Sequence, residues 1–412
     1  MGCAGPLPRI EQQPLGVTRC VLVTDGDERS ALAVVRSLGR AGHTVYVCST
    51  SGWSIAGASR YAEGEARVET PLRNPSKFAR DVSDLIVKWR VDTLIPMTEQ
   101  AFNSVFASPD LFTGIMIPSA APEIFRAISD KRAVMDAAAE CGLRVPTQVV
   151  LTSPRDADRL AADAVQFPVV IKPARSVVQE NGAQIKMGVT HCADYVALRS
   201  ALERTPPSAY PLLLQQRIVG PGVGVFFLIW DGERVATFAH RRIREKPPAG
   251  GVSVYRESVA ADDDLVARSE RLLCRFGWRG VAMIEYKVDA RTGEPFIMEI
   301  NGRFWGSLQL AIDSGVDFPR LLVARASGER VHGPAKYKVG IRSKWEWGEV
   351  DYGLARLRRS DSQLSLPPGS PGRLRSLLRL LVPWVPGDRF EILRASDPVP
   401  FWRETVRYFR LK

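Results

Sequence analysis

The stretch FIMEINGRFWGS, residues 296–307, carries three polar side chains at alternate positions of an otherwise apolar run. Glu299, Asn301 and Arg303 offer a carboxylate, an amide and a guanidinium. Side chains two apart on a strand point to the same side, so these groups would converge on one face. Burying them without partners costs several kcal/mol, and we therefore expect a metal ion or an anion to supply those partners.

A second carboxylate, Glu285, lies in the apolar segment VAMIEYKV, 14 positions before Glu299. The turn sequence DARTGEP between them predicts a hairpin, whose pairing could bring both carboxylates to one site. Two close carboxylates repel unless a cation lies between them, and Mg²⁺ prefers one or two carboxylates together with phosphate oxygens. We predict that Glu285, Glu299 and Asn301 bind Mg²⁺ or Mn²⁺, and that Arg303 donates to a transferring phosphoryl group or acyl phosphate. The alternative is a solvated strand edge, which the apolar neighbours disfavour.

Two lysines are candidates for binding nucleotide phosphates. Lys131 follows Asp130 at the start of a predicted helix, and Lys172 ends the apolar strand FPVVIK. A single lysine of this kind is more often a side chain that reaches from a buried stem to water, but the pair could neutralise triphosphate oxygens. The polar loop 175–184 lies where a flap could cover the phosphates, although Gly182 is its only glycine.

A basic stretch, residues 238–258, supplies candidates for substrate binding, which are His240, Arg241, Arg242, Arg244 and Ser253. Guanidinium groups bind carboxylates and phosphates through paired hydrogen bonds, so this cluster could clamp a substrate carboxylate and its acyl phosphate. We expect Arg242 to act in catalysis with Arg303 and Lys172. A solvated basic strand is the alternative, and the hairpin register decides which residues face the site.

The N-terminal part of the chain alternates strands and helices. After a flexible tail (1–17), the pattern predicts strands at 21–26, 43–49, 91–98 and 112–119 and helices at 28–42 and 77–90. The strands are too apolar for a sheet that is covered on one face only, which argues for helices on both faces. We predict a doubly wound α/β domain over residues 18–120.

Residues 121–345 follow a different pattern. A capped helix that ends at Gly142 precedes several strands, which are joined by tight glycine turns such as WDGER. This part of the chain is predicted to be an α+β domain, in which helices are interspersed with an antiparallel sheet.

The remaining segment, 346–412, is predicted to be a basic extension. Residues 352–412 include 12 basic and 5 acidic side chains, and LPPGSPG (366–372) marks a flexible joint. The segment 373–382 places four leucines on one stripe of a helix, at Leu374, Leu377, Leu378 and Leu381. We expect this helix to dock on the protein's own body, with weak peripheral membrane contact as the alternative.

Charge and composition limit the partners and the compartment. The 412 residues include 56 basic and 45 acidic side chains, and the net charge of +11 favours anionic partners. The C-terminal arginines lie among leucines rather than among stacking aromatics, so we expect no nucleic-acid partner. Six widely spaced cysteines form no CxxC pair, and no apolar run is long enough to cross a bilayer. A cytoplasmic location fits these features.

Five motifs, in this order and spacing, resemble the ATP-grasp superfamily over roughly residues 18–345. They are DK (130–131), VVIKPA (169–174), LLLQQRIVGPG (212–222), AMIEYK (282–287) and MEINGRFWGS (298–307). The likeness is greatest to the carboxylate-amine ligases that are related to the large chain of carbamoyl-phosphate synthase and to biotin carboxylase. The resemblance implies an ATP-grasp fold over 121–345, with a pre-ATP-grasp domain before it.

The resemblance also implies roles for individual residues. Lys131 and Lys172 would hold the nucleotide phosphates, and the backbone of the hinge Gln215, Gln216, Arg217 and Ile218 would meet adenine. Glu285, Glu299 and Asn301 would bind magnesium, while Arg303 would stabilise the reacting phosphate.

The expected activity is an ATP-dependent ligase. It would activate a carboxylate as an acyl phosphate and transfer it to the amine of an amino acid or peptide-like substrate, releasing ADP and phosphate. The alternatives are activation of bicarbonate, as in carbamoyl-phosphate synthase or biotin carboxylase, and a nucleotide-binding regulator without turnover.

Overall fold

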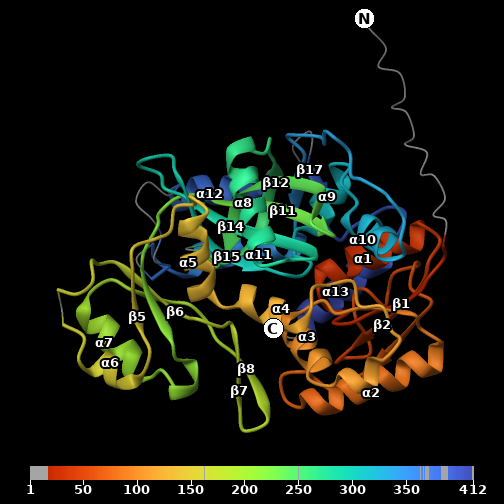
Figure 1. Cartoon of the computed structure of the whole chain (residues 1–412). Helices are drawn as coiled ribbons and strands as arrows, with labels where there is room; N and C mark the ends of the chain where they lie inside the picture. The colour runs from red at the N-terminus through yellow and green to blue at the C-terminus, as the bar shows by residue number, and fades with distance from the viewer. Residues whose placement is uncertain are drawn as a thin grey trace, which may run out of the picture.

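The computed structural model describes residues 17–161, 163–248, 250–361, 363–364, 366, 371–381 and 388–410. Residues 1–16 of the expected tail and 367–370 of the expected joint lie outside these ranges. Figure 1 shows the chain from its red N-terminal part to its blue C-terminal part, which returns to lie beside the beginning.

The first unit contains a parallel sheet in the order β3-β2-β1-β4. Its elements are β1 (Cys20–Val23), α1 (Arg29–Arg40), β2 (Thr44–Ser49), β3 (Gly64–Arg67), α2 (Pro75–Trp89), β4 (Thr93–Ile95) and α3 (Glu99–Phe106). The predicted α/β class is therefore confirmed. The strand expected at 112–119 is wrong, because Met116 makes only an isolated bridge to Thr93.

A helix pair leads to a smaller antiparallel sheet in the order β5-β10-β6-β9. The elements are α4 (Pro122–Ser129), α5 (Lys131–Glu140), β5 (Gln148–Leu151), α6 (Pro154–Asp158), β6 (Val169–Pro173), β9 (Thr190–Cys192), α7 (Tyr195–Glu203) and β10 (Leu212–Gln216). Asp130 separates the two helices, and its carboxylate accepts hydrogen bonds from the backbone of Arg132 and Ala133 at the start of α5. This cap fixes where Lys131 begins its helix.

The expected polar loop 175–184 is instead part of a hairpin, β7 (Val177–Glu180) and β8 (Ala183–Lys186). Figure 1 shows this hairpin extending towards the first unit. Gln184 is buried there, where its side chain donates to the carbonyls of Pro71 and Gln100 and to Ser104 Oγ, each at 3.0 Å. These bonds attach the hairpin to the first unit.

The largest sheet has the strand order β15-β14-β11-β12-β13-β16-β17. Its elements are β11 (Gly222–Trp230), β12 (Glu233–Lys246), β13 (Val252–Ser258), α8 (Asp263–Arg275), β14 (Gly280–Val288), β15 (Pro295–Asn301), α9 (Leu308–Asp313), α10 (Phe318–Ala326), β16 (Arg342–Lys344) and β17 (Asp388–Phe390). One continuous core joins apolar residues of α1 and β1 to Phe226 and Phe238 of this sheet. A second core lies between the sheet and α4, α5 and α8.

The C-terminal segment is integrated into this architecture. β17 pairs in parallel with β16, and the segment also contains α11 (Glu346–Arg358), α12 (Arg373–Leu381) and α13 (Val399–Arg410). Asp397 accepts from buried Arg36 of α1 at 2.8 Å, so the end of the chain is tied to its beginning. Within the part of the chain that the structure describes, no helix combines the length and apolar character needed to cross a bilayer.

Candidate active site

A cavity of about 660 Å³ lies between the small sheet and the large sheet. We call it the central cavity. The structure brings eleven of the predicted residues to its wall, which are Lys172, Gln216, Arg217, Ile218, His240, Arg242, Ser253, Glu285, Glu299, Asn301 and Arg303. These residues come from positions up to 131 apart in the sequence, so the fold creates the site.

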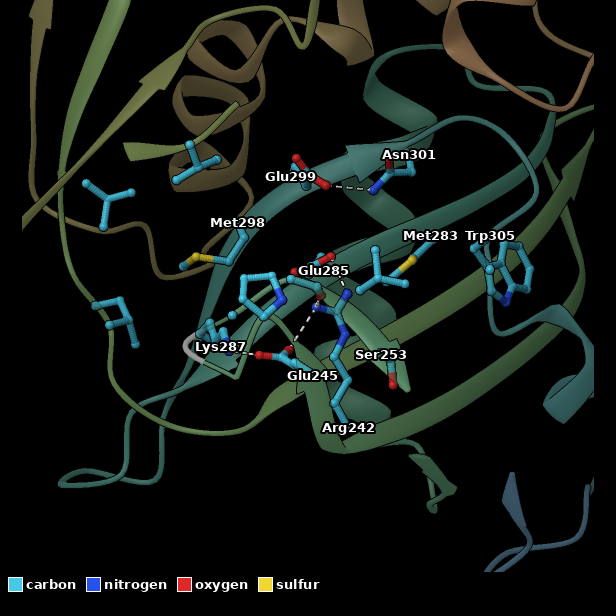
Figure 2. Close-up of a pocket in the computed structure, with 18 of the residues that line it drawn as sticks. Arg242, Glu245, Ser253, Met283, Glu285, Lys287, Met298, Glu299, Asn301 and Trp305 are labelled. Atoms are coloured by element: carbon cyan, nitrogen blue, oxygen red, sulfur yellow. Dashed lines mark hydrogen bonds and ion pairs between the residues drawn. The ribbon is translucent and has the colours of Figure 1, made fainter. Parts of the chain in front are cut away.

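The carboxylates pair across the hairpin that the sequence predicted. Glu285 on β14 is the register partner of Glu299 on β15 (Figure 2). Asn301 Nδ2 donates to Glu299 Oε1 at 3.0 Å, and Arg303 Nη2 donates to Asn301 Oδ1 at 3.2 Å. The three polar residues of the stretch 296–307 therefore form one chain of hydrogen bonds along the cavity wall.

Arg242 reaches Glu285 from two strands away. Its Nη2 donates to Glu285 Oε2 at 2.5 Å, and its Nη1 donates to Glu245 Oε1 at 3.0 Å. Lys287 adds a further cation, whose Nζ lies 3.1 Å from Glu245 Oε2. The cavity floor is thus a set of alternating charges, which Figure 2 shows as a row from Lys287 to Glu285.

Two glycines of β11 leave the space that these side chains occupy. A Cβ on Gly222 would lie 2.8 Å from Cδ of Arg242, and a Cβ on Gly224 would lie 2.9 Å from Nε2 of His240. Both distances are shorter than a real Cβ contact, so a larger residue at either position would force these side chains to shift. The Gly-x-Gly pattern at 222–224, within an otherwise apolar strand, is the sequence signal that marks this space.

The two predicted lysines converge on Glu299. Lys131 Nζ lies 3.8 Å from Glu299 Oε2 and donates to Ser176 Oγ at 2.7 Å. Lys131 is buried behind Glu299 and is not part of the cavity wall. Lys172 does line the cavity, with its Nζ 3.7 Å from Met298 Sδ.

Burial and neighbouring charges shift the pKa values at this site in different directions. Burial lowers the pKa of Lys172 to about 8, against the attraction of Glu299. Burial also raises the pKa of Glu285, although Arg242 opposes the shift. For Glu299 the effect of burial is outweighed, because Lys131, the Asn301 amide, Lys172 and Arg303 together hold its pKa below the ordinary value. The paired carboxylates are therefore not equivalent.

The side chains of the predicted hinge do not all face the cavity. Gln215 is buried, and its Nε2 donates to Gln148 Oε1 at 2.8 Å, away from the cavity wall. Gln216, Arg217 and Ile218 line the cavity. The strand alternation of β10 explains why the side chains of the first two hinge residues point to opposite sides.

The structure does not bring Arg241 and Arg244 to the central cavity. Arg241 is half-exposed and pairs with Glu257 at 2.8 Å on the other face of β12. Arg244 follows a register shift between positions 242 and 244, and its Nε donates to Glu349 Oε1 of α11 at 2.9 Å. This irregularity breaks the alternation that would have put Arg242 and Arg244 on one face.

His240 lies in the cavity wall as a neutral imidazole. It packs edge-on to Phe226, with ring centroids 4.8 Å apart. Burial, reinforced by Arg242 and Arg256, holds its pKa well below the ordinary value. Ser253 completes this end of the cavity.

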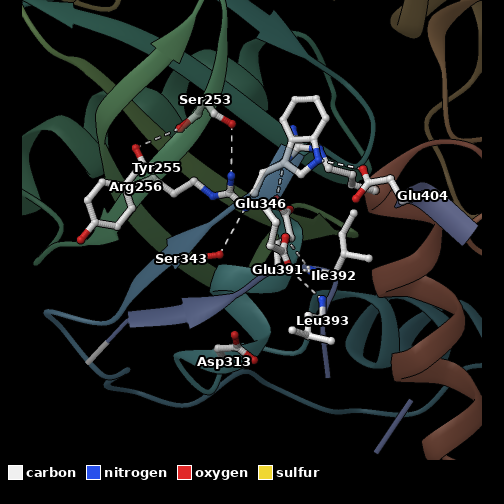
Figure 3. A network of polar contacts seen from close by, with 12 residues as sticks. Ser253, Tyr255, Arg256, Asp313, Ser343, Glu346, Glu391, Ile392, Leu393 and Glu404 are labelled. Atoms are coloured by element: carbon white, nitrogen blue, oxygen red, sulfur yellow. Dashed lines mark hydrogen bonds and ion pairs between the residues drawn. The ribbon is translucent and has the colours of Figure 1, made fainter. Parts of the chain in front are cut away.

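Arg29, at the start of α1, also lines the cavity, and sequence reasoning missed it. Its guanidinium lies 4.1 Å from the ring centroid of Trp345 and pairs with buried Glu391. Glu391 also pairs with Arg256 at 2.5 Å, and Arg256 Nη1 donates to the Ser253 carbonyl at 3.1 Å (Figure 3). The C-terminal segment therefore supports the substrate end of the cavity. No local sequence signal connects Arg29 with a carboxylate more than 360 positions away.

The described residues form no cluster of three or more His, Cys, Asp or Glu side chains that could enclose a metal ion. Glu285, Glu299 and the Asn301 amide instead fit a cation that arrives with phosphate oxygens, because Mg²⁺ commonly takes one or two carboxylates and completes its shell from a bound nucleotide. The predicted ligands are therefore of the type that binds Mg²⁺ together with a nucleotide.

Residues 208–348 match a family model described as "ATP-grasp in the biosynthetic pathway with Ter operon". This range includes the hinge residues, both carboxylates, Asn301 and Arg303. No curated protein sequence matches the chain.

Solved structures share the fold at low sequence identity. Biotin carboxylase from Campylobacter jejuni, in complex with β,γ-ATP, is 16% identical with a TM-score of 0.63, and the match covers 79% of this chain and 74% of the carboxylase. L-amino acid ligase from Bacillus licheniformis is 17% identical with a TM-score of 0.58, with 75% of each chain covered.

A third structure is the biotin carboxylase domain of the Hydrogenobacter thermophilus 2-oxoglutarate carboxylase, which contains MgADP and bicarbonate. It is 15% identical with a TM-score of 0.61, and the match covers 79% of this chain and 74% of that one. Together with the family match, these structures confirm the expected ATP-grasp fold.

Proposed function

We propose that this chain, an ATP-grasp protein by its family match and its fold, is an ATP- and Mg²⁺-dependent ligase that joins a carboxylate to an amine. The observation that carries the proposal is the cross-strand pair of Glu285 and Glu299, which shares one cavity with Arg303 and Lys172. This combination suits the transfer of a phosphoryl group to a carboxylate.

The described geometry suggests a role for each side chain. Lys172 binds nucleotide phosphates at the cavity wall, Lys131 holds Glu299 in position from behind, and the segment 216–218 meets adenine. Glu285, Glu299 and Asn301 would hold Mg²⁺, which would neutralise phosphate charge when bound with the nucleotide.

The reaction proceeds in two steps. A substrate carboxylate oxygen attacks the γ-phosphorus, and the bond from that phosphorus to the oxygen of ADP breaks. An uncharged amine then attacks the acyl carbon of the acyl phosphate, phosphate leaves, and the amine gives up a proton. Arg303 stabilises the charge on the transferring phosphoryl group. Arg242 and Lys172 are the other two residues that we assign to catalysis.

We assign the substrate end of the cavity to the part lined by Arg29, His240, Arg242 and Ser253. Arg29 can bind an anionic group of the substrate, and neutral His240 can donate or accept one hydrogen bond. We propose an amino acid or a peptide-like molecule as the amine. Arg241 and Arg244 lie outside this wall and no longer form part of the substrate proposal.

Activation of bicarbonate remains the second candidate, because two of the three similar structures described above are biotin carboxylases and one of them contains bicarbonate. We propose that the partners are ATP and small molecules, without nucleic acid, and that the protein works in the cytoplasm. The five described cysteines are free, which is consistent with a reducing compartment.

The test is a screen of amino acids, dipeptides and bicarbonate for substrate-stimulated release of ADP and phosphate by the purified protein. An amine-dependent signal supports the ligase, and a signal with bicarbonate alone supports the second candidate. Glu299→Ala and Arg303→Ala should fold and lose the signal, whereas Glu257→Ala, which removes a carboxylate outside the cavity, should keep it. Nucleotide binding without turnover for every substrate would favour a non-catalytic regulator, and unchanged turnover in both site variants would contradict the site assignment.

A further inference from the structure

The C-terminal helix α13 displays an apolar stripe to the outside of the protein. Val399, Trp402, Val406 and Phe409 are 51%, 62%, 41% and 67% exposed. Their spacing of three, four and three residues places them on one side of the helix. Amphipathic helices on a protein body normally turn such a stripe inwards, so this arrangement requires an explanation.

The other side of α13 holds the helix firmly in this orientation. Tyr408 stacks on Trp347 of α11 with ring centroids 4.2 Å apart, and its hydroxyl donates to Asp351 at 2.7 Å. Trp345 Nε1 donates to Glu404 at 2.8 Å, while Phe401 packs against the main core. The exposed stripe is therefore a fixed part of the surface.

Arginines border the stripe along one side. Arg403 and Arg410 lie over the ring of Trp53, at 4.8 Å and 5.5 Å from its centroid, and Arg407 pairs with Asp27. The only acidic residue of α13, Glu404, faces inwards to Trp345. Arg403 also lies 3.5 Å from Glu65, so Arg410 is the exposed arginine beside the stripe, and α13 itself contributes no acid to its outer side.

The charges of the whole C-terminal segment are distributed in the same way. Asp388, Glu391 and Asp397 are 8%, 2% and 1% exposed and hold the segment to the body of the protein. The exposed arginines of this segment are Arg358, Arg359, Arg373, Arg375, Arg389 and Arg410. Asp361 is the exposed acid of the stretch 352–410, so exposed arginines outnumber exposed acids on this part of the surface.

Helix α12 adds a second outward-facing apolar group. Leu374 and Leu378 are 72% and 53% exposed, whereas Ser376 is buried. The expectation that the leucine stripe docks on the body is therefore wrong for these two leucines; the side chains of Leu377 and Leu381, and Val382, lie outside the described residues. The helix itself packs against α11, the same helix that supports α13.

We propose that α13 binds the surface of an anionic phospholipid bilayer. Aromatic and aliphatic side chains of an interfacial helix enter the boundary between headgroups and acyl chains, while arginines meet the lipid phosphates. Tryptophan is especially favourable at this depth. A second copy of the chain is a poorer partner, because a symmetric contact would bring two arginine borders together. This proposal is independent of the reaction in the central cavity.

The test is co-sedimentation of the full chain with extruded vesicles. Vesicles of phosphatidylcholine and phosphatidylglycerol in equal parts should bind the protein, vesicles of phosphatidylcholine alone should bind it at least about tenfold less, and added salt should release it. The double variant Trp402→Ser/Phe409→Ser should lose at least about tenfold in binding to the anionic vesicles. Far-UV circular dichroism and thermal unfolding check that it folds like the parent, because Phe409 also packs edge-on against Trp347, with ring centroids 5.3 Å apart.

The matched control is Val87→Ser/Val196→Ser, which removes two side chains that are 76% and 77% exposed on α2 and α7. This variant should sediment like the parent. The proposal is overturned if the parent ignores both kinds of vesicle, binds them equally, or binds as tightly after the α13 substitutions as before. Sedimentation equilibrium showing a dimer that the α13 variant dissociates, without vesicle binding, would instead assign this face to a second copy.

Discussion

Arg242 Nη2 lies 2.5 Å from Glu285 Oε2, although the two residues belong to strands β12 and β14 with β11 between them. The contact passes over Gly222 and Gly224, where β11 has no side chains. A buried arginine is thereby placed beside one of the two carboxylates to which we assign Mg²⁺. Any cation at Glu285 shares that carboxylate with Arg242, so the arginine is positioned to tune both metal affinity and phosphoryl transfer.

Removing the Arg242 guanidinium should damage both stability and turnover. Arg242→Met leaves Glu285 without its ion-pair partner and Glu245 with Lys287 alone, and loss of one partner of a buried pair costs about 3–5 kcal/mol. Urea unfolding measures this loss. Arg242→Lys should recover part of the stability but little of the turnover, because an ammonium cannot bridge both carboxylates in the same fork geometry. Full activity in the lysine variant would show that charge alone suffices.

Gly222→Ala should impair the site by steric means alone. The added Cβ would lie 2.8 Å from Arg242 Cδ and 2.9 Å from Glu245 Oε1, so we expect a destabilisation of about 1–3 kcal/mol and reduced ADP release. Gly188→Ala is the matched control, because no atom lies within 4 Å of its added Cβ. Equal unfolding free energies for the two variants would contradict the proposed path of Arg242 across β11.

The pKa of Lys172 predicts a basic limit for nucleotide use. Burial lowers that pKa to about 8, so the side chain is cationic below pH 8 and loses its charge as the pH rises through that value. We expect kcat/KM for ATP to fall above pH 8, by up to about tenfold per pH unit for loss of one required proton. Lys172→Arg keeps its charge at high pH, so the fall in kcat/KM should begin at a higher pH in this variant. If kcat/KM falls at the same pH in the arginine variant, the proton is lost from a group other than Lys172.

Glu404 should make stability depend on pH near neutrality. Burial raises its pKa to about 7, despite the hydrogen bond from Trp345. Between pH 4.5 and 7 the folded state keeps a proton that the unfolded state releases, so the contribution of this group to stability falls as the pH rises through that window. Glu404→Gln should raise the free energy of unfolding at pH 8 by up to about 3 kcal/mol, and the gain should vanish near pH 4.5. A gain of the same size at every pH would point to packing instead.

The parts of the site that the sequence predicted depend on local geometry. Glu285 and Glu299 share a hairpin whose turn residues and alternation were visible, and the structure pairs them. Asn301 and Arg303 followed from the same alternation. The αβ alternation of the first unit was equally visible, because each strand and helix there has its own periodicity.

The features that could not be predicted from the sequence depend on contacts between distant segments or on breaks in the regular strand pattern. A bulge in β12 separates Arg244 from Arg242, and no sequence pattern marked it. Arg29 and Glu391 meet only because the C-terminal segment returns to α1. The polar stretch 175–184 was expected to be a loop, but it belongs to the hairpin 177–186, whose buried Gln184 finds its hydrogen-bond partners in the first unit.

The tie between Asp397 and Arg36 also has a consequence for synthesis on the ribosome. Arg36 is 1% exposed, and the partners of its guanidinium are the Asp397 side chain and carbonyls of residues 391, 392 and 397. A nascent chain can form the parallel sheet of the first unit early, but that unit then carries an arginine whose partners have not yet been translated. Contacts across about 360 residues delay this docking until residues 391–397 have emerged.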